Sequence, residues 1–382
     1  MKSEPSTAML DAMLSFQRSV MDESFKAWNR VLAAPAVAEK SFQVHVSTTP
    51  HDVVMEKDEL RLLHYRPIKK QAYLEPVLIT YALVNRPYIL DLQPDRSVVR
   101  QFLEKGFDVY LIDWGVPTAA DRTMRLADYV AGSMRHIIEV VRRLNGVPHV
   151  NLLGYCMGGT MSTIFTTLYP DLVRNLMLMA APIDFSGDEC LLHLWTREDV
   201  FDVDRLIDAY GNCPATLLQS SFQLMKPVQN FVEKYITFSE NMADPKFLEN
   251  YFAMEKWTND NIPVAGETFR EFVKCFYQRN QLVKGEYKLD GKTVQLSRIE
   301  CPLLLLTADF DHLVLPQSTL GIRPHVGSKD VTHLNIAAGH VGLAVGSKAH
   351  RDFWPKVSQW AADRSTPLNP TEPVATSTAQ GV

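Results

Sequence analysis

The sequence is poor in the features that mark secreted, metal-binding or membrane-spanning proteins. Its five cysteines are scattered and include no C-x-x-C pair: Cys156, Cys190, Cys213, Cys275 and Cys301. An odd number without paired spacing argues against a disulfide framework and a zinc site, and favours a reducing compartment. No run approaches the roughly 18 apolar residues of a membrane span, and no basic N-terminal segment leads into an apolar stretch. We therefore expect a cytoplasmic protein without a transmembrane segment.

Positive charge and nucleotide-binding motifs are also lacking. The 382 residues carry a formal net charge of −5, which gives no basic surface for nucleic acid. The motifs G-x-x-x-x-G-K-[ST], G-x-G-x-x-G and H-E-x-x-H are absent, so no standard phosphate cradle or metal site is expected. What is present is an ordinary globular composition, 46% apolar and 22% charged. The length suits one large domain or a domain with an insertion.

A strand, a Gly-x-Cys-x-Gly turn and a helix follow one another around Cys156. Residues 150–155 have β-compatible side chains, and residues 157–169 have apolar residues at helical spacing. This order predicts a nucleophile elbow with sulfur in place of oxygen, in which glycines let the strand and helix pass close to a strained backbone. Cys156 would lie at a helix N-terminus, where the dipole favours thiolate. The alternative is an inert core thiol, since the pentapeptide alone is a weak signal.

Buried strands alternate with helices through much of the chain. Alternating apolar residues from Phe42 to Arg66 are typical of antiparallel strands at a sheet edge. A helical pattern from Leu126 to Leu144 is closed by Gly146. Continuous apolar runs predict buried parallel strands at 77–84, 109–113, 150–155, 176–181, 303–307 and 334–337. The order predicts a doubly wound α/β sheet with helices on both faces.

The alternation stops at Pro182 and resumes at Cys301. The intervening residues are rich in aromatics and methionine, and we expect 183–295 to be a helical insertion that caps the carboxyl ends of the strands and excludes water. The α/β core then comprises 41–182 and 296–364. The polar, Pro/Thr-rich residues 365–382 predict a disordered tail.

The N-terminal segment, 1–40, carries a helical pattern of its own. Apolar residues at spacings of three and four over 6–34 predict an amphipathic helix that ends before Pro35. Its apolar stripe either packs on the body of the protein or docks onto a partner subunit or a hydrophobic surface.

A cysteine nucleophile needs a base, and the base needs an orienting acid. In the nucleophile-elbow fold these follow the nucleophile in the order acid, then histidine. Asp309 and Asp311 follow the strand predicted at 303–307. We favour Asp311 as the acid, partly from the family resemblance given below; the alternative for either aspartate is a loop or helix-capping role.

His340 follows the next predicted strand and is flanked by glycines. That setting makes it a better candidate base than His333 or His325, which are more typical of packed histidines. His312 directly follows the acid and is either a residue that lines the site or a solvated loop histidine.

Two backbone amides are expected to bind a developing oxyanion. One is the amide of Met157, the residue after the nucleophile. The other comes from the loop after an early central strand, where the candidate is an amide near Val84 or Asn85, and Asn85 is also a candidate to line the site. A cysteine that attacks a thioester forms another thioester of similar energy, so transfer from a carrier thiol such as coenzyme A is nearly balanced.

Several motifs, in matching order and spacing, resemble poly(3-hydroxyalkanoate) synthases over about residues 40–362. They are Tyr81–Leu92 (YALVNRPYILDL), Asp108–Gly115 (DVYLIDWG), Gly154–Gly159 (GYCMGG), Arg174–Leu176, Pro182–Phe185 (PIDF), Asp311–Val314 (DHLV) and Gly339–Gly342 (GHVG). The resemblance implies an α/β-hydrolase core with a cap, and a catalytic Cys, Asp and His at Cys156, Asp311 and His340.

The resemblance also implies an activity. Such synthases polymerise (R)-3-hydroxyacyl-CoA, release CoA, act as dimers and lie on the surface of cytoplasmic polyester granules. They use no cofactor, since coenzyme A is a leaving group of the substrate. The short chain resembles the two-component type (class III/IV-like), whose catalytic subunit works with a smaller accessory subunit. The alternatives are a Cys-dependent hydrolase or depolymerase, a non-catalytic granule-associated protein, and a small-molecule acyl-CoA transferase.

Overall fold

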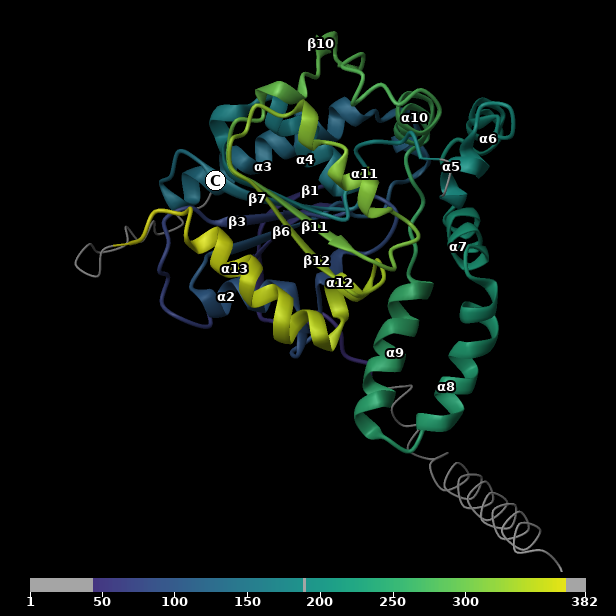
Figure 1. The fold of residues 1–382 in the computed structure, drawn as a ribbon, viewed down its shortest axis with the longest axis horizontal. Helices are drawn as coiled ribbons and strands as arrows, with labels where there is room; N and C mark the ends of the chain where they lie inside the picture. Colours follow the sequence, from purple (N-terminus) through teal and green to yellow (C-terminus); the bar gives the residue numbers. More distant parts are fainter. Residues whose placement is uncertain (1–43, 188–189, 369–382) are drawn as a thin grey trace, which may run out of the picture. The chain divides into compact units, whose positions relative to one another are not determined.

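The computed structural model describes residues 44–187 and 190–368, drawn in colour in Figure 1. Contacts divide the chain into two compact units. Among the described residues, the larger contains Val46–Ser221 and those from Asp260 onward, and the smaller contains Phe222–Asn259. The amphipathic helix predicted over 6–34 lies outside the described residues and stays a prediction.

The larger unit is built on an eight-stranded sheet with the order β1-β2-β6-β3-β7-β8-β11-β12. The six strands from β6 to β12 run parallel, whereas β1 and β2 pair antiparallel and β2 is antiparallel to β6. Their bounds are β1 His51–Lys57, β2 Leu60–Tyr65, β3 Val77–Thr80, β6 Val109–Asp113, β7 Val150–Tyr155, β8 Val173–Met179, β11 Leu303–Ala308 and β12 Val331–Ile336. The predicted α/β class is confirmed.

The predicted strands agree in place but differ at their ends. β6 and β7 have the predicted bounds, but β3 ends at Thr80 and β8 begins at Val173. The prediction that alternation from Phe42 marks strand was wrong at Val44 and Val46, which lie outside any strand. Ser47 has a φ of 55° and donates its N–H to the carbonyl of Asp91 at 3.0 Å, which turns the chain before β1 begins.

Helices lie on both faces of the sheet; Figure 1 shows α3 and α4 on one face and α2 and α13 on the other. The helical pattern predicted up to Leu144 forms η3 and α3, which end at Gly146 in the left-handed conformation (φ 63°). The helices of this part are α2 Val98–Lys105, η3 Asp128–Met134, α3 Arg135–Asn145, α4 Met157–Leu168, α11 Pro316–Leu320, α12 Gly342–Val345, η9 Ala349–Phe353 and α13 Trp354–Ala362. Short elements complete it: η1 Pro87–Leu90, β4 Asp91–Gln93, β5 Arg96–Ser97, η2 Ala119–Thr123, η4 Pro170–Leu172 and η8 Arg323–His325.

The segment predicted as an insertion, 183–295, is mainly helical. Its elements are α5 Leu191–Thr196, α6 Val203–Tyr210, α7 Ala215–Leu224, η5 Gln229–Glu233, α8 Lys234–Asn241, α9 Pro245–Asn259, α10 Gly266–Glu271 and η6 Phe272–Gln278, followed by β9 Lys288–Leu289, β10 Lys292–Thr293 and η7 Leu296–Arg298. Within the smaller unit, Lys234 on α8 pairs with Glu255 on α9 at 2.9 Å, and the rings of Phe238 and Tyr251 lie 4.5 Å apart.

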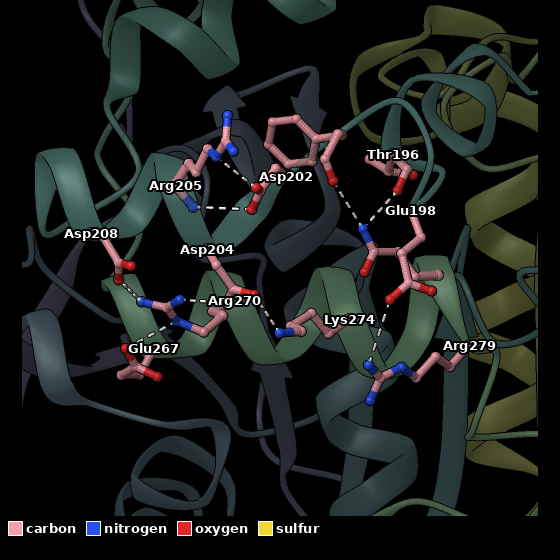
Figure 2. A network of polar contacts seen from close by, with 12 residues as sticks. Thr196, Glu198, Asp202, Asp204, Arg205, Asp208, Glu267, Arg270, Lys274 and Arg279 are labelled. Atoms are coloured by element: carbon pink, nitrogen blue, oxygen red, sulfur yellow. Dashed lines mark hydrogen bonds and ion pairs between the residues drawn. The ribbon is translucent and has the colours of Figure 1, made fainter.

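In the larger unit, charged side chains join α6 to α10 and η6 (Figure 2). Arg270 contacts Asp204 at 2.5 Å, Asp208 at 2.7 Å and Glu267 at 3.2 Å. Lys274 contacts Asp204 at 2.6 Å. One arginine therefore holds three carboxylates, two of them from a helix more than 60 positions away in the chain.

A buried polar network joins the amino ends of the central strands to residues near the end of the described chain. Asn151 on β7 donates to Ser365 Oγ and to the carbonyl of Glu75, both at 3.0 Å. Glu75 accepts from the N–H (2.7 Å) and the hydroxyl (2.8 Å) of Thr366. Asn175 on β8 donates to Asn151 at 2.7 Å.

Because of this network, the ordered part of the chain extends beyond the predicted start of the tail. The disordered tail was predicted to begin at 365, but Ser365 and Thr366 are fixed by it, and Leu368 donates to the carbonyl of Ala72 at 2.9 Å. The low hydrophobicity of this stretch signalled disorder, whereas its hydroxyl and backbone groups satisfy buried polar atoms. Residues 369–382 lie outside the described part.

Candidate active site

Cys156 occupies the sharp turn between β7 and α4. Its backbone has φ 55° and ψ −129°, a conformation that costs free energy for a residue with a side chain. Its N–H donates to the carbonyl of Met179 on β8 at 2.9 Å, and its own carbonyl accepts from Gly159 at 2.8 Å. The strained turn from strand to helix is as the sequence predicted.

Three glycines around Cys156 allow this close approach. A Cβ at Gly154 would lie 2.6 Å from Gly159 Cα, and one at Gly159 would lie 2.4 Å from the Cβ of Ala181. A Cβ at Gly158 would lie 2.3 Å from the carbonyl oxygen of Thr80, the last residue of β3. The start of α4 therefore packs directly on the ends of its neighbouring strands.

Asp311 and His340 lie together in the buried interior. His340 Nδ1 donates to Asp311 Oδ2 at 2.7 Å. The other carboxylate oxygen, Oδ1, accepts from the N–H groups of Leu313 and Val314, both at 2.9 Å. Both carboxylate oxygens of Asp311 thus accept hydrogen bonds, and the imidazole of His340 is held at Nδ1.

Burial by itself would lower the pKa of His340. The negative charges of Asp311 and Cys156 and the hydrogen bonds to both groups outweigh it and raise the pKa to about 10. Since Nδ1 faces Asp311, the nitrogen left for the sulfur is Nε2. The structure therefore brings Cys156, Asp311 and His340 together.

The other candidate acids and bases differ from this pair in burial and in the groups that they contact. Asp309 is exposed and accepts from Asn335 Nδ2 at 2.5 Å. His333, on β12, hydrogen-bonds Thr307 at 2.7 Å. Burial lowers the pKa of His333, and the charge of Arg323 lowers it further. His325 is exposed in η8. His312 is half-buried, and its carbonyl lies 3.6 Å from the sulfur of Cys190.

The two predicted oxyanion amides lie at the ends of adjacent strands. Met157 is the first residue of α4, so its N–H has no partner within the helix. Val84 and Asn85 lie in the loop after β3. The Asn85 side chain is buried and holds the loop itself: its oxygen accepts from the N–H of Arg86 at 2.6 Å, and its nitrogen donates to Asn261 at 3.1 Å.

Sequence reasoning missed residues that support this site from far along the chain. Tyr88, just after the loop, donates to Asp260 at 3.0 Å. Burial raises the pKa of Tyr277 on η6, as do the nearby Cys156 and Cys190, so its hydroxyl stays protonated beside the thiol. The aromatic content of the insertion was visible, but no spacing pattern singled out Tyr277.

Among the described residues, no cluster of three His, Cys, Asp or Glu side chains could hold a metal ion. The helices of the same residues are too short or too polar to cross a membrane.

Two family models match the chain. The α/β-hydrolase fold model matches residues 75–342, and the poly-beta-hydroxybutyrate polymerase (PhaC) N-terminus model matches residues 18–102. Among solved structures, Est1E from Butyrivibrio proteoclasticus aligns with a TM-score of 0.50 at 11% identity, covering 83% of this chain and 98% of that one. This likeness supports the fold alone.

Relatives of known name are much closer in sequence. The poly(3-hydroxyalkanoate) polymerase subunit PhaC of Haloferax mediterranei is 46% identical over 92% of this chain and 72% of its own length. The same subunit of Haloarcula marismortui is 42% identical over 93% and 76%, and that of Allochromatium vinosum 40% identical over 84% and 90%. The chain belongs to the family of poly(3-hydroxyalkanoate) polymerase PhaC subunits, with an α/β-hydrolase fold.

Proposed function

We propose that the protein polymerises (R)-3-hydroxyacyl-CoA, with 3-hydroxybutyryl-CoA as the expected substrate, through an acyl thioester on Cys156. The observation that carries the proposal is the strained, helix-capping Cys156 beside a buried His340 that Asp311 orients at 2.7 Å. The family's established role in polyester synthesis supports the reaction class.

In the first half-reaction, Cys156 passes its thiol proton to His340 Nε2, and the thiolate attacks the carbonyl carbon of the substrate thioester. The amides of Met157 and of the Val84 region stabilise the oxyanion that forms. The carbon–sulfur bond to coenzyme A then breaks, and the leaving thiolate takes the proton from His340. The product is an acylated Cys156 and free CoA.

In the second half-reaction, His340 removes the proton from a 3-hydroxyl group, and the oxygen attacks the acyl carbon on Cys156. The bond to the Cys156 sulfur breaks, the new ester bond lengthens the polymer by one unit, and the proton on His340 returns to the thiolate. Asp311 keeps the imidazole in the orientation and tautomer that both steps require.

The partners follow from the same proposal. No cofactor takes part, because coenzyme A enters and leaves as part of the substrate. The family resemblance supports a homodimer that works with a smaller accessory subunit at the surface of cytoplasmic polyester granules.

The test is to incubate the purified protein, alone and with an accessory subunit, with 3-hydroxybutyryl-CoA, while CoA release, polymer and free acid are measured separately. Cys156→Ala should abolish CoA release and polymer. Cys213→Ala is the matched control, since Cys213 is fully buried and burial raises the pKa of its thiol to about 12. Free acid without polymer would favour the hydrolase, and CoA release that survives Cys156→Ala would refute the assigned nucleophile.

A further inference from the structure

The residue before the candidate nucleophile contacts the candidate base. Tyr155, the last residue of β7, is 1% exposed, and its ring stacks on the imidazole of His340 with centroids 5.0 Å apart and an interplanar angle of 28°. Its hydroxyl donates to the backbone carbonyl of His340 at 3.1 Å. Behind it, the ring of Tyr81 lies 5.4 Å away. Tyr155 is therefore fixed between the loop after β3 and the base.

The imidazole of His340 is thus held from three sides. Asp311 binds Nδ1 at 2.7 Å, Tyr155 covers one face of the ring, and the sulfur of Cys156 faces the remaining nitrogen. The charges of both Asp311 and Cys156 act on His340. Tyr155 contributes no charge at neutral pH, because burial holds its pKa well above its usual range.

The loop that carries His340 is held through its carbonyl groups. α12 follows the base directly, and the last carbonyls of a helix have no partner within it. Side chains supply the missing donors: Trp354 Nε1 to Leu343 at 2.8 Å, His350 Nε2 to Ala344 at 2.6 Å and Arg96 to Val345 at 2.6 Å. Tyr155 acts on His340 itself and belongs to the strand that ends at the nucleophile.

We propose that Tyr155 is a positioning residue that fixes the imidazole of His340 relative to the sulfur of Cys156. The inference rests on the proposed function, in which His340 is the base. One side chain next to the nucleophile thereby sets the distance over which the proton moves. A displacement of about 1 Å between reacting groups can cost on the order of a hundredfold in rate.

The test compares Tyr155→Phe with Tyr110→Phe. Tyr110 is also a buried sheet tyrosine stacked on a histidine, His64, with centroids 4.3 Å apart, and its hydroxyl accepts from Asn145 at 2.9 Å. Both variants keep a ring and lose one buried hydroxyl. Three quantities are measured on the full-length protein: CoA release from 3-hydroxybutyryl-CoA, the rate of Cys156 alkylation by iodoacetamide against pH, and the titration of His340 by NMR of 13C-labelled histidine.

We expect Tyr155→Phe to lower kcat about tenfold, with KM changed less than about twofold, because the carbonyl of His340 loses its donor while the substrate contacts remain. The pKa of His340 should fall toward the ordinary histidine value, and alkylation should slow. Tyr110→Phe should change none of the three. Equal melting temperatures of the two variants separate positioning from general destabilisation.

The inference is overturned if Tyr155→Phe matches Tyr110→Phe in the His340 titration and in alkylation. Both readouts are independent of polymerisation. If the wild-type protein forms no polymer, the proposed function is refuted, and the His340 titration and Cys156 alkylation still decide whether Tyr155 positions the base.

Discussion

Substitution Gly158→Ala tests whether the contact between β3 and α4 sets the geometry of the site. The new Cβ would lie 2.3 Å from the carbonyl oxygen of Thr80 and 2.7 Å from the carbonyl carbon of Tyr81. Both are backbone atoms, and Thr80 is hydrogen-bonded into the sheet, so no flexible side chain can move aside.

The size of the displacement follows from these distances. Carbon and carbonyl oxygen approach no closer than about 3.3 Å in ordinary contacts, so α4 and β3 must separate by about 1 Å. The amide of Met157 moves with α4, whereas the Val84 region stays with β3. Misplacement of this size should lower kcat about a hundredfold, and overpacking should lower the free energy of unfolding by about 1–3 kcal/mol.

The assay is CoA release under saturating substrate, combined with urea denaturation. Gly132→Ala is the control, because a Cβ there meets its nearest atom, the carbonyl oxygen of Ala127, at 3.8 Å. That variant should keep both rate and stability. A folded Gly158→Ala protein with wild-type kcat would refute the view that this packing aligns the two amides.

Three further predictions concern the acid, a buried histidine and the charged network. Asp311→Asn should lower kcat by about 10⁴ in the same assay, because the amide no longer favours the required tautomer, whereas Asp309→Asn should change it little; equal losses would refute the assignment of the acid. Burial outweighs the hydrogen bond to a carbonyl and lowers the pKa of His350. Below pH about 6.5 the unfolded chain therefore binds more protons than the folded one, and the free energy of unfolding falls by up to about 1.4 kcal/mol for each unit by which the pH is lowered. His350→Gln should flatten this slope in urea titrations between pH 5 and 7, roughly the window that the shift defines. Arg270→Met should lower the free energy of unfolding by about 1 kcal/mol, and by less in 1 M salt, because the carboxylates that it contacts are partly exposed. Arg205→Ala is the control: the Arg205 side chain is 90% exposed, and its loss should cost nothing measurable.

The sequence predicted those parts of the site that follow from local pattern. Cys156 stands between a strand run and a helix run, and Asp311 and His340 each follow a strand, so the rule that side chains gather at the carboxyl ends of parallel strands made them candidates. The choice of Asp311 over Asp309 also depended on the family resemblance. The flanking glycines indicated the strained backbone at Cys156, because they let the strand and the helix pass close to it.

The supporting contacts could not be predicted, since they depend on distant segments. Asn85 bonds to Asn261, 176 positions away, and the sequence indicated no pairing between them. Tyr155 looked like an ordinary β residue, and its contact with His340 arises only when β7 lies beside the loop after β12. The early end of β3 is likewise a tertiary effect, because residues 81–84 leave the sheet to form the loop that Asn85 holds.

The network at the amino ends of the strands has a consequence for synthesis of the chain. Glu75 is paired with Thr366, 291 positions later, and Asn151 with Ser365, 214 positions later. A ribosome that has already produced the nucleophile, the acid and the base has therefore not yet produced the groups that satisfy these buried atoms. A chain that stops after His340 would hold every proposed catalytic residue and still leave polar groups unpaired in its core, so this fold can be completed only after nearly all of it has been made.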